Sequence, residues 1–141
     1  MASLAETSAG LRCWVEIPPG LPLVSADPVM LSHAFANLLD NALKFSSPDA
    51  PIDVEARSVG GQVLVGVADR GVGVPADELD RIFEKFYRRR QSDAIQAAST
   101  GTGLGLAVAK GVVQVHGGRI WAEQRHGGGM VVRVRLPVAE E

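Results

Sequence analysis

The sequence lacks the features that identify several common classes of protein. Cysteine occurs once, at Cys13, so the chain can form neither an internal disulfide nor a cysteine-based zinc site. No apolar run approaches the roughly 20 residues that a membrane-spanning helix needs. The first ten residues have neither the basic start nor the apolar core of a signal peptide. The formal charge of −2 argues against a dedicated nucleic-acid-binding protein, and the whole pattern is compatible with a cytoplasmic location.

The remaining composition is that of one globular domain. Apolar residues make up 46% of the 141 positions and charged residues 21%, as in ordinary folded proteins. A chain of this length buries roughly two thirds of its extended surface on folding. The residue patterns predict strands at 12–17, 52–58, 62–69, 119–124 and 130–137, and helices at 28–45, 75–86 and 103–117. This order predicts an α/β fold, a two-layer sandwich of a mixed β-sheet packed on one face by helices.

The helix predicted at 28–45 has an unusual polar face. Asn37, Asn41 and Lys44 fall within about 60° of one another, because successive helical residues turn by about 100°. A separate apolar arc consists of Leu31, Phe35, Leu38 and Ala42. Amide oxygens one turn apart suit Mg²⁺, which also takes water and phosphate oxygens, and the lysine could reach those phosphates. For an isolated N-x-x-x-N, a solvated polar face is the commoner explanation.

A carboxylate and two glycines follow the strand predicted at 62–69. Asp69 ends this strand, and Gly71 and Gly73 come directly after it. A carboxylate can accept a hydrogen bond from the amino group of adenine, and glycines let a flat ring approach the backbone closely. A tight turn after a strand favours the same residue types, so both interpretations are open.

A third pattern precedes the last predicted helix. Gly101, Gly103 and Gly105 alternate immediately before an apolar helical segment. Glycine-rich backbone at a helix N-terminus offers free N–H groups and the positive end of the helix dipole to an anion. Neither a G-x-x-x-x-G-K-[ST] motif nor a G-x-G-x-x-G motif is present, which excludes a Walker loop and the dinucleotide-binding fingerprint. A flexible loop joined to a helix is the alternative.

The order of these motifs along the chain is more specific than any one of them. The sequence reads N-L-L-x-N-A-x-K-F, D-x-G-x-G, F-E-K-F-Y-R and G-T-G-L-G-L-A, beginning at Asn37, Asp69, Phe83 and Gly101. The series resembles the ATP-binding catalytic domain of sensor histidine kinases, which belongs to the GHKL superfamily and has the Bergerat ATP-binding fold. The resemblance covers about residues 11–137. Within the family, the motifs are most similar to those of the potassium-sensing kinases called KdpD.

The resemblance implies roles for the helix and for the residues after the strand. Asn41 would bind Mg²⁺ with help from Asn37, and Lys44 would contact the phosphates of ATP. Asp69 would accept a hydrogen bond from the adenine amine, while Gly71 and Gly73 line the base pocket. ATP and Mg²⁺ are therefore the expected cofactors.

The resemblance also implies a lid over the triphosphate. Arg88 matches a basic lid position that often reaches phosphate, and Phe83 and Phe86 would pack under the lid. The glycine turn over the triphosphate would consist of Gly101, Thr102, Gly103, Leu104, Gly105 and Leu106. Relatives usually have glutamine or arginine at the position of His33, so the resemblance does not imply its role. We expect His33 to contact a residue that binds the metal rather than to bind the metal itself.

The phosphoacceptor of such kinases is missing from this sequence. In the family it is a histidine followed by an acid on a separate helical hairpin, whereas neither His33, His116 nor His126 is followed by an acid. We therefore expect no catalytic residue in this chain, with residues 1–10 a linker remnant and 11–141 the ATP-binding domain. The expected partners are the dimerisation and phosphoacceptor domain of the same kinase and a response-regulator receiver domain. The domain itself is expected to be a monomer, the cytosolic part of an inner-membrane receptor, without direct membrane contact.

Other functions fit parts of the same pattern. A serine-directed anti-sigma kinase or a DNA-repair ATPase shares the asparagine helix and D-x-G-x-G, but a complete F-E-K-F-Y-R would be unexpected there. A nucleotide-sensing module that never catalyses is a second alternative. Binding of nucleic acid through residues 88–90 is a third, and the net charge argues against it.

Overall fold

The computed structural model describes residues 2–6, 12–16, 24, 26–46, 50–85 and 104–138. Its strands are β1 (Ala2–Glu6), β2 (Arg12–Glu16), β3 (Ile52–Val59), β4 (Gln62–Ala68), β5 (Arg119–Gln124) and β6 (Met130–Pro137). Its helices are α1 (Pro28–Phe45) and α3 (Gly105–Val115), with short 3₁₀ segments η1 (Ala76–Glu78) and η2 (Arg81–Phe83).

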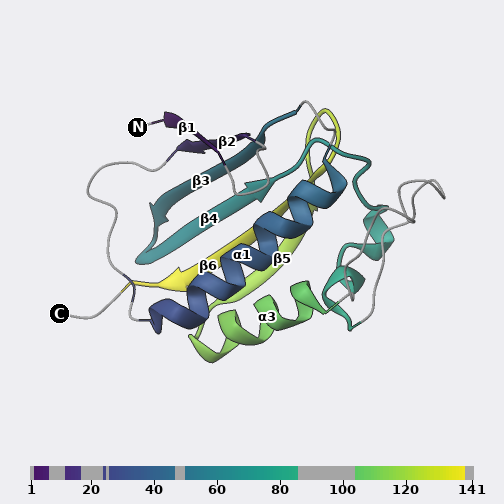
Figure 1. Ribbon diagram of the computed structural model, residues 1–141. Coiled ribbons are helices and arrows are strands. Elements are labelled where there is room, and N and C mark those ends of the chain that lie inside the picture. The colour runs from purple at the N-terminus through teal and green to yellow at the C-terminus, as the bar shows by residue number, and fades with distance from the viewer. Residues whose placement is uncertain are drawn as a thin grey trace.

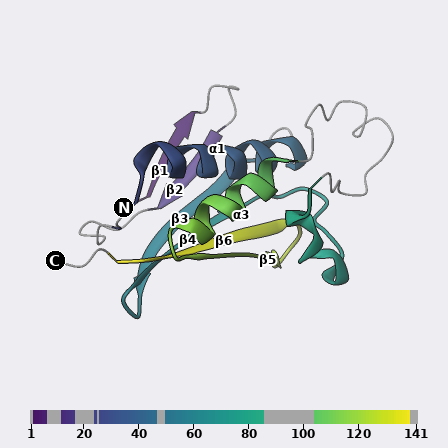
Figure 2. The same ribbon diagram turned by 90° about the horizontal axis from the view of Figure 1, so that it is seen from below.

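The strands form one mixed sheet in the order β1-β2-β3-β4-β6-β5. β2 and β3 run parallel, and each of the other neighbouring pairs is antiparallel. Both α-helices lie on the same face of this sheet, as the two views in Figures 1 and 2 show. The predicted two-layer α/β sandwich with helices on one face is therefore confirmed.

The core lies between the helices and the covered face of the sheet. α1 contributes Leu38 and Ala42 to it from the predicted apolar arc, and Leu31 and Phe35 pack against its edge. The other buried members that line this layer include Ile52, Val67, Leu106, Ala109, Val113, Val132 and Val134. Because this arc faces the sheet, the polar face of α1 is turned away from the core.

Two parts of the chain differ from the predicted elements. The segment at 75–86 was predicted as one helix, but its described part forms only η1 and η2, so this prediction is wrong. The backbone is extended again at Glu84, with ψ 147°, and Ile82 and Phe83 are buried in the core. Burial of these side chains outweighs local helix propensity. The strand β1, within residues 1–10, was not predicted, and the domain boundary after residue 10 stays a prediction.

The start of α1 is tied to the end of α3. Oδ1 of Asp27 accepts hydrogen bonds from the N–H groups of Val29 (2.9 Å) and Met30 (3.1 Å), which caps α1. The Asp27 N–H donates to Nε2 of His116 at 3.0 Å. Since Nε2 accepts, Nδ1 carries the proton and donates to the Val112 carbonyl at 2.8 Å. The helices are thus antiparallel, and the N-terminus of α3 lies along the later turns of α1.

Candidate functional site

The predicted polar face of α1 is present, and we call Asn37, Asn41 and Lys44 the amide ridge. All three side chains are half-buried, between the core-facing arc and solvent. They occur on consecutive turns of one continuous helix, so the two amides and the ammonium follow one line. A half-buried ridge of this kind can present oxygens to a ligand without being occupied in core packing.

Lys44 has a partner that the sequence analysis did not identify. Its Nζ lies 3.1 Å from Oδ2 of Asp40, one helical turn earlier. The Asp40 side chain is 64% exposed, so water screens this ion pair strongly. Exposed i,i+4 pairs contribute only about 0.3–0.5 kcal/mol, which a phosphate could easily exceed. The D-x-x-x-K spacing was visible in the sequence, but it also fits an ordinary surface pair.

The N-terminus of α3 adjoins the amide ridge. A methyl group on Gly105 would lie 3.6 Å from Oδ1 of Asn37, so two motifs that are 68 positions apart are in contact distance. Leu104, the N-cap residue of α3, makes no side-chain hydrogen bond to this helix end, and no other capping side chain is found among the described residues. The positive end of the helix dipole is therefore next to the amide oxygens. Leu104 and Gly105 are half-buried there, while Leu106 is buried in the core.

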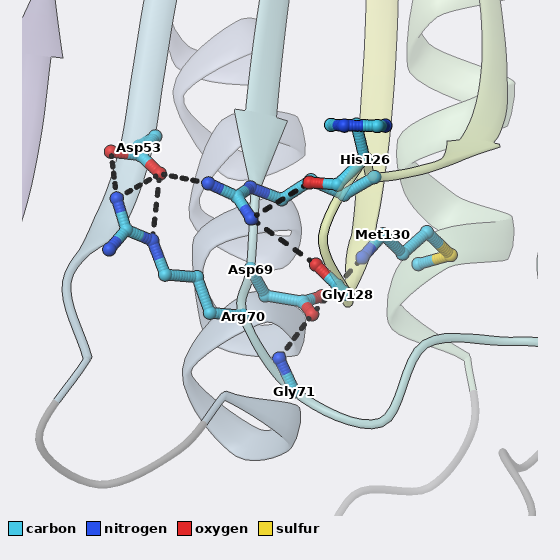
Figure 3. Close-up of polar contacts among 8 residues, drawn as sticks. Asp53, Asp69, Arg70, Gly71, His126, Gly128 and Met130 are labelled. Atoms are coloured by element: carbon cyan, nitrogen blue, oxygen red, sulfur yellow. Dashed lines mark hydrogen bonds and ion pairs between the residues drawn. The ribbon is translucent and has the colours of Figure 1, made fainter.

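Asp69 is the most buried charged residue among those described, at 2% exposure. Its Oδ1 accepts hydrogen bonds from the N–H of Gly71 at 3.0 Å and of Met130 at 3.3 Å, as Figure 3 shows. Its own N–H donates to the Met130 carbonyl at 2.9 Å. Backbone donors compensate the burial of the carboxylate and fix its orientation. Residues 69–73, which include the predicted Gly71 and Gly73, are called the base loop below.

Two glycines allow the base loop to lie against the turn between β5 and β6. Gly73 has φ +70°, and a side chain there would come within 3.1 Å of the Gly129 carbonyl oxygen. A methyl group on Gly129, at φ +90°, would overlap the backbone oxygen of Asp69. Gly129 is not among the site residues predicted from the sequence. The only signal was three consecutive glycines at 127–129, more than a simple turn requires.

The three predicted motifs lie at the same end of the molecule. The later turns of α1, the end of β4 and the beginning of α3 lie at the same side in Figure 1. α1 also contacts both β4 and α3. Four predicted site residues, Arg88, Gly101, Thr102 and Gly103, lie outside the described residues, as does Phe86.

The side chains at the site can be compared with the ligands that a metal ion requires. In the described part of the chain, no cluster of three or more His, Cys, Asp or Glu side chains could hold a metal ion. The ridge instead offers neutral amide oxygens, which fit Mg²⁺ when phosphate oxygens and water complete its shell. Within the same residues, no helix is long and apolar enough to cross a membrane.

Comparison with known proteins places these features in a family. Residues 26–140 match the family described as histidine kinase-, DNA gyrase B-, and HSP90-like ATPase. Over 124 residues the chain is 34% identical to the sensor protein kinase WalK of Staphylococcus saprophyticus, a match that spans 86% of this chain but 20% of WalK. This chain thus corresponds to a small part of that relative.

Solved structures of sensor histidine kinases have the same fold. The mycobacterial sensor histidine kinase MprB superposes with a TM-score of 0.70 at 28% identity, covering 90% of this chain and 84% of that one. Full-length ShkA in complex with AMPPNP also gives 0.70, at 32% identity, covering 90% and 26%. None of these three relatives is KdpD, so the narrower resemblance stays a prediction. The chain belongs to the histidine kinase-, DNA gyrase B-, and HSP90-like ATPase family, and within that family it is similar to the ATP-binding catalytic domains of sensor histidine kinases.

Proposed function

We propose that this domain binds Mg²⁺–ATP and presents the γ-phosphate to a histidine on a separate helical hairpin. The observation that carries the proposal is that the end of β4 with the buried, backbone-held Asp69, the amide ridge and the N-terminus of α3 lie at the same end of the molecule. The similarity to ShkA, solved with the ATP analogue AMPPNP, supports nucleotide binding by this domain. The named relatives are sensor histidine kinases rather than serine-directed kinases or DNA-repair ATPases.

The base loop recognises adenine. The Asp69 carboxylate, already oriented by Gly71 and Met130, accepts a hydrogen bond from the exocyclic amine. The oxygen that guanine carries at the same position would meet the carboxylate as a second acceptor. Gly73, at φ +70°, lets this loop lie against the backbone of Gly129.

The amide ridge and the N-terminus of α3 bind the triphosphate. Asn41 and Asn37 would hold Mg²⁺, which when bound would neutralise part of the negative charge of the phosphates. Lys44 exchanges the exposed Asp40 carboxylate for a phosphate oxygen. The N-terminus of α3 adds a positive dipole end beside Asn37. Arg88 and the glycine turn from Gly101 to Leu106 would close over the triphosphate.

Phosphoryl transfer requires mainly positioning and stabilisation of charge. The domain supplies both, while the attacking nucleophile comes from the dimerisation and phosphoacceptor domain of the same kinase. A receiver-domain aspartate of a response regulator would then take the phosphoryl group. The parent would be a KdpD-like membrane receptor, and this domain in isolation would be a monomer.

The proposal is tested by supplying the missing hairpin. The purified domain is mixed with a phosphoacceptor hairpin domain and radiolabelled ATP. We expect acid-labile, base-stable phosphate on the hairpin histidine, and none on this domain alone. Robust self-labelling of the domain would contradict the proposal, as would a failure to bind ATP by calorimetry. ATP binding without any transfer would favour the nucleotide-sensing alternative.

A further inference from the structure

Asp53, on β3, is held between two arginines beside the base loop. Nε and Nη2 of Arg70 donate to its Oδ2 at 3.3 and 3.1 Å, and Nη2 also reaches Oδ1 at 3.4 Å. Nη2 of Arg125 lies 3.8 Å from the same Oδ2. Figure 3 shows the Asp53 carboxylate with the guanidinium of Arg70 bonded to it. We call Asp53, Arg70 and Arg125 the Asp53 bracket.

The bracket joins segments that are not neighbours in the sheet. Asp53 pairs with Ala68, the last residue of β4, and β4 separates β3 from β6. Arg125 belongs to the turn between β5 and β6, where its Nη1 donates to the carbonyls of His126 and Gly128, both at 3.3 Å. The bracket therefore crosses the end of β4 and fixes the turn to β3.

Both arms of the bracket end at residues that orient Asp69. Arg70 lies between Asp69 and Gly71 in the chain, so its anchoring restrains the base loop directly. The turn held by Arg125 leads into Met130, whose N–H donates to the Asp69 carboxylate. Loosening either arm would displace an element on which the carboxylate depends.

We propose that Asp53 is a positioning residue for adenine recognition, acting through Arg70 and Arg125. The inference rests on the proposed function and names a determinant of its base selectivity. The Asp53 side chain is 33% exposed, so each ion pair alone is weak. Their joint effect is geometric: discrimination between an amine and an oxygen depends on how firmly the reading carboxylate is held.

The test compares Asp53→Asn with Glu55→Gln as a matched control. Glu55 is the next residue on the same face of β3, and it pairs with Arg133 at 3.5 Å. Each variant removes one carboxylate charge from an arginine pair, but only Asp53 is linked to the base loop. Asp53→Glu, which keeps the charge, serves as the rescue variant.

Two readouts are measured on each folded variant. The first is the ratio of the dissociation constants for GTP and ATP, and the second is amide hydrogen exchange at Gly71 and Met130 without nucleotide. We expect Asp53→Asn to lower the GTP/ATP ratio about threefold to tenfold and to speed exchange at both amides. Glu55→Gln should match wild type, and Asp53→Glu should recover most of the selectivity.

The outcomes distinguish failure of the proposed role of Asp53 from failure of the proposed function of the domain. Wild-type selectivity in Asp53→Asn, or an equal loss in Glu55→Gln, overturns the role of Asp53 and leaves the proposed function intact. Arg125→Gln offers an independent variant if Asp53→Asn does not fold, with the same expected loss. A wild-type protein that does not bind ATP refutes the proposed function, and the positioning role with it.

Discussion

The base loop and the amide ridge lie at the same end of the molecule but are held very differently. In the base loop, Asp69 is almost inaccessible and its carboxylate is oriented by two backbone N–H groups. On the ridge, the side chains are half-buried, and Lys44 is paired with a carboxylate that is largely exposed. One region is fixed before any ligand arrives, and the other can exchange its contacts.

The difference matches two kinds of recognition. A base is identified by a specific hydrogen bond, which requires a donor or acceptor already in place. A triphosphate with its cation is bound by charge, which tolerates side chains that rearrange at a cost of a few tenths of a kcal/mol. We therefore expect mutations in the base loop to affect folding and selectivity together, and mutations on the ridge to affect affinity alone.

The largest effect is expected from Gly129→Ala. The new methyl group would overlap the backbone oxygen of Asp69, and φ +90° is unfavourable for alanine. The free energy of unfolding should fall by about 3 kcal/mol or more, measured by urea denaturation. Gly128→Ala is the control, because φ is +116° there but no atom lies within 4 Å of the added methyl group. Equal losses in both variants would show that the close approach to Asp69 is unimportant.

The second prediction concerns the carboxylate itself. Asp69→Ala removes the acceptor for adenine and leaves the N–H groups of Gly71 and Met130 without this partner. ATP affinity should fall roughly 10- to 100-fold by calorimetry, and stability by about 1–3 kcal/mol. Unchanged ATP affinity in a folded Asp69→Ala protein would remove the base loop from the site.

The third prediction moves to the ridge, where stability should be preserved. Asn41→Ala should weaken ATP binding roughly tenfold when Mg²⁺ is present and have little effect when the metal is chelated. Ser32→Ala, on an exposed position of the same helix, is the control. Metal-dependent binding that survives in Asn41→Ala would count against the assigned ligand.

The smallest effect should come from the partner of Lys44. Asp40→Asn should raise ATP affinity about twofold, since the ammonium no longer has to leave a carboxylate, and lower stability by about 0.3–0.5 kcal/mol. The gain should disappear in a Lys44→Met background, which a double-mutant cycle measures. A gain that persists without Lys44 would reflect general charge repulsion instead.

The parts of the site that depend on one segment could be predicted from the sequence. The spacing of Asn37, Asn41 and Lys44 fixes them to one side of α1, whatever the rest of the chain does. The same holds for Asp69 and Gly71, which follow β4 directly. The structure agrees with the sequence at these positions because local geometry determines them.

Features that depend on several segments could not be predicted in this way. The contact of Gly129 with Asp69 and the Asp53 bracket both require the strand order β3-β4-β6, which no local pattern specifies. The error at 75–86 has a similar origin, since Ile82 and Phe83 are buried by contacts outside their own segment. Helix propensity depends on a segment's own residues, whereas tertiary contacts with other segments can override it and determine the secondary structure that forms.

The most direct test of this account is an NMR titration that separates the two ends of the nucleotide. Adenosine alone should shift the backbone amides of Gly71 and Met130 and leave the side-chain amides of Asn37 and Asn41 unchanged. Mg²⁺–ATP should shift both sets. If Mg²⁺–ATP shifts neither set, or only one of them, the base loop and the amide ridge do not form one nucleotide site.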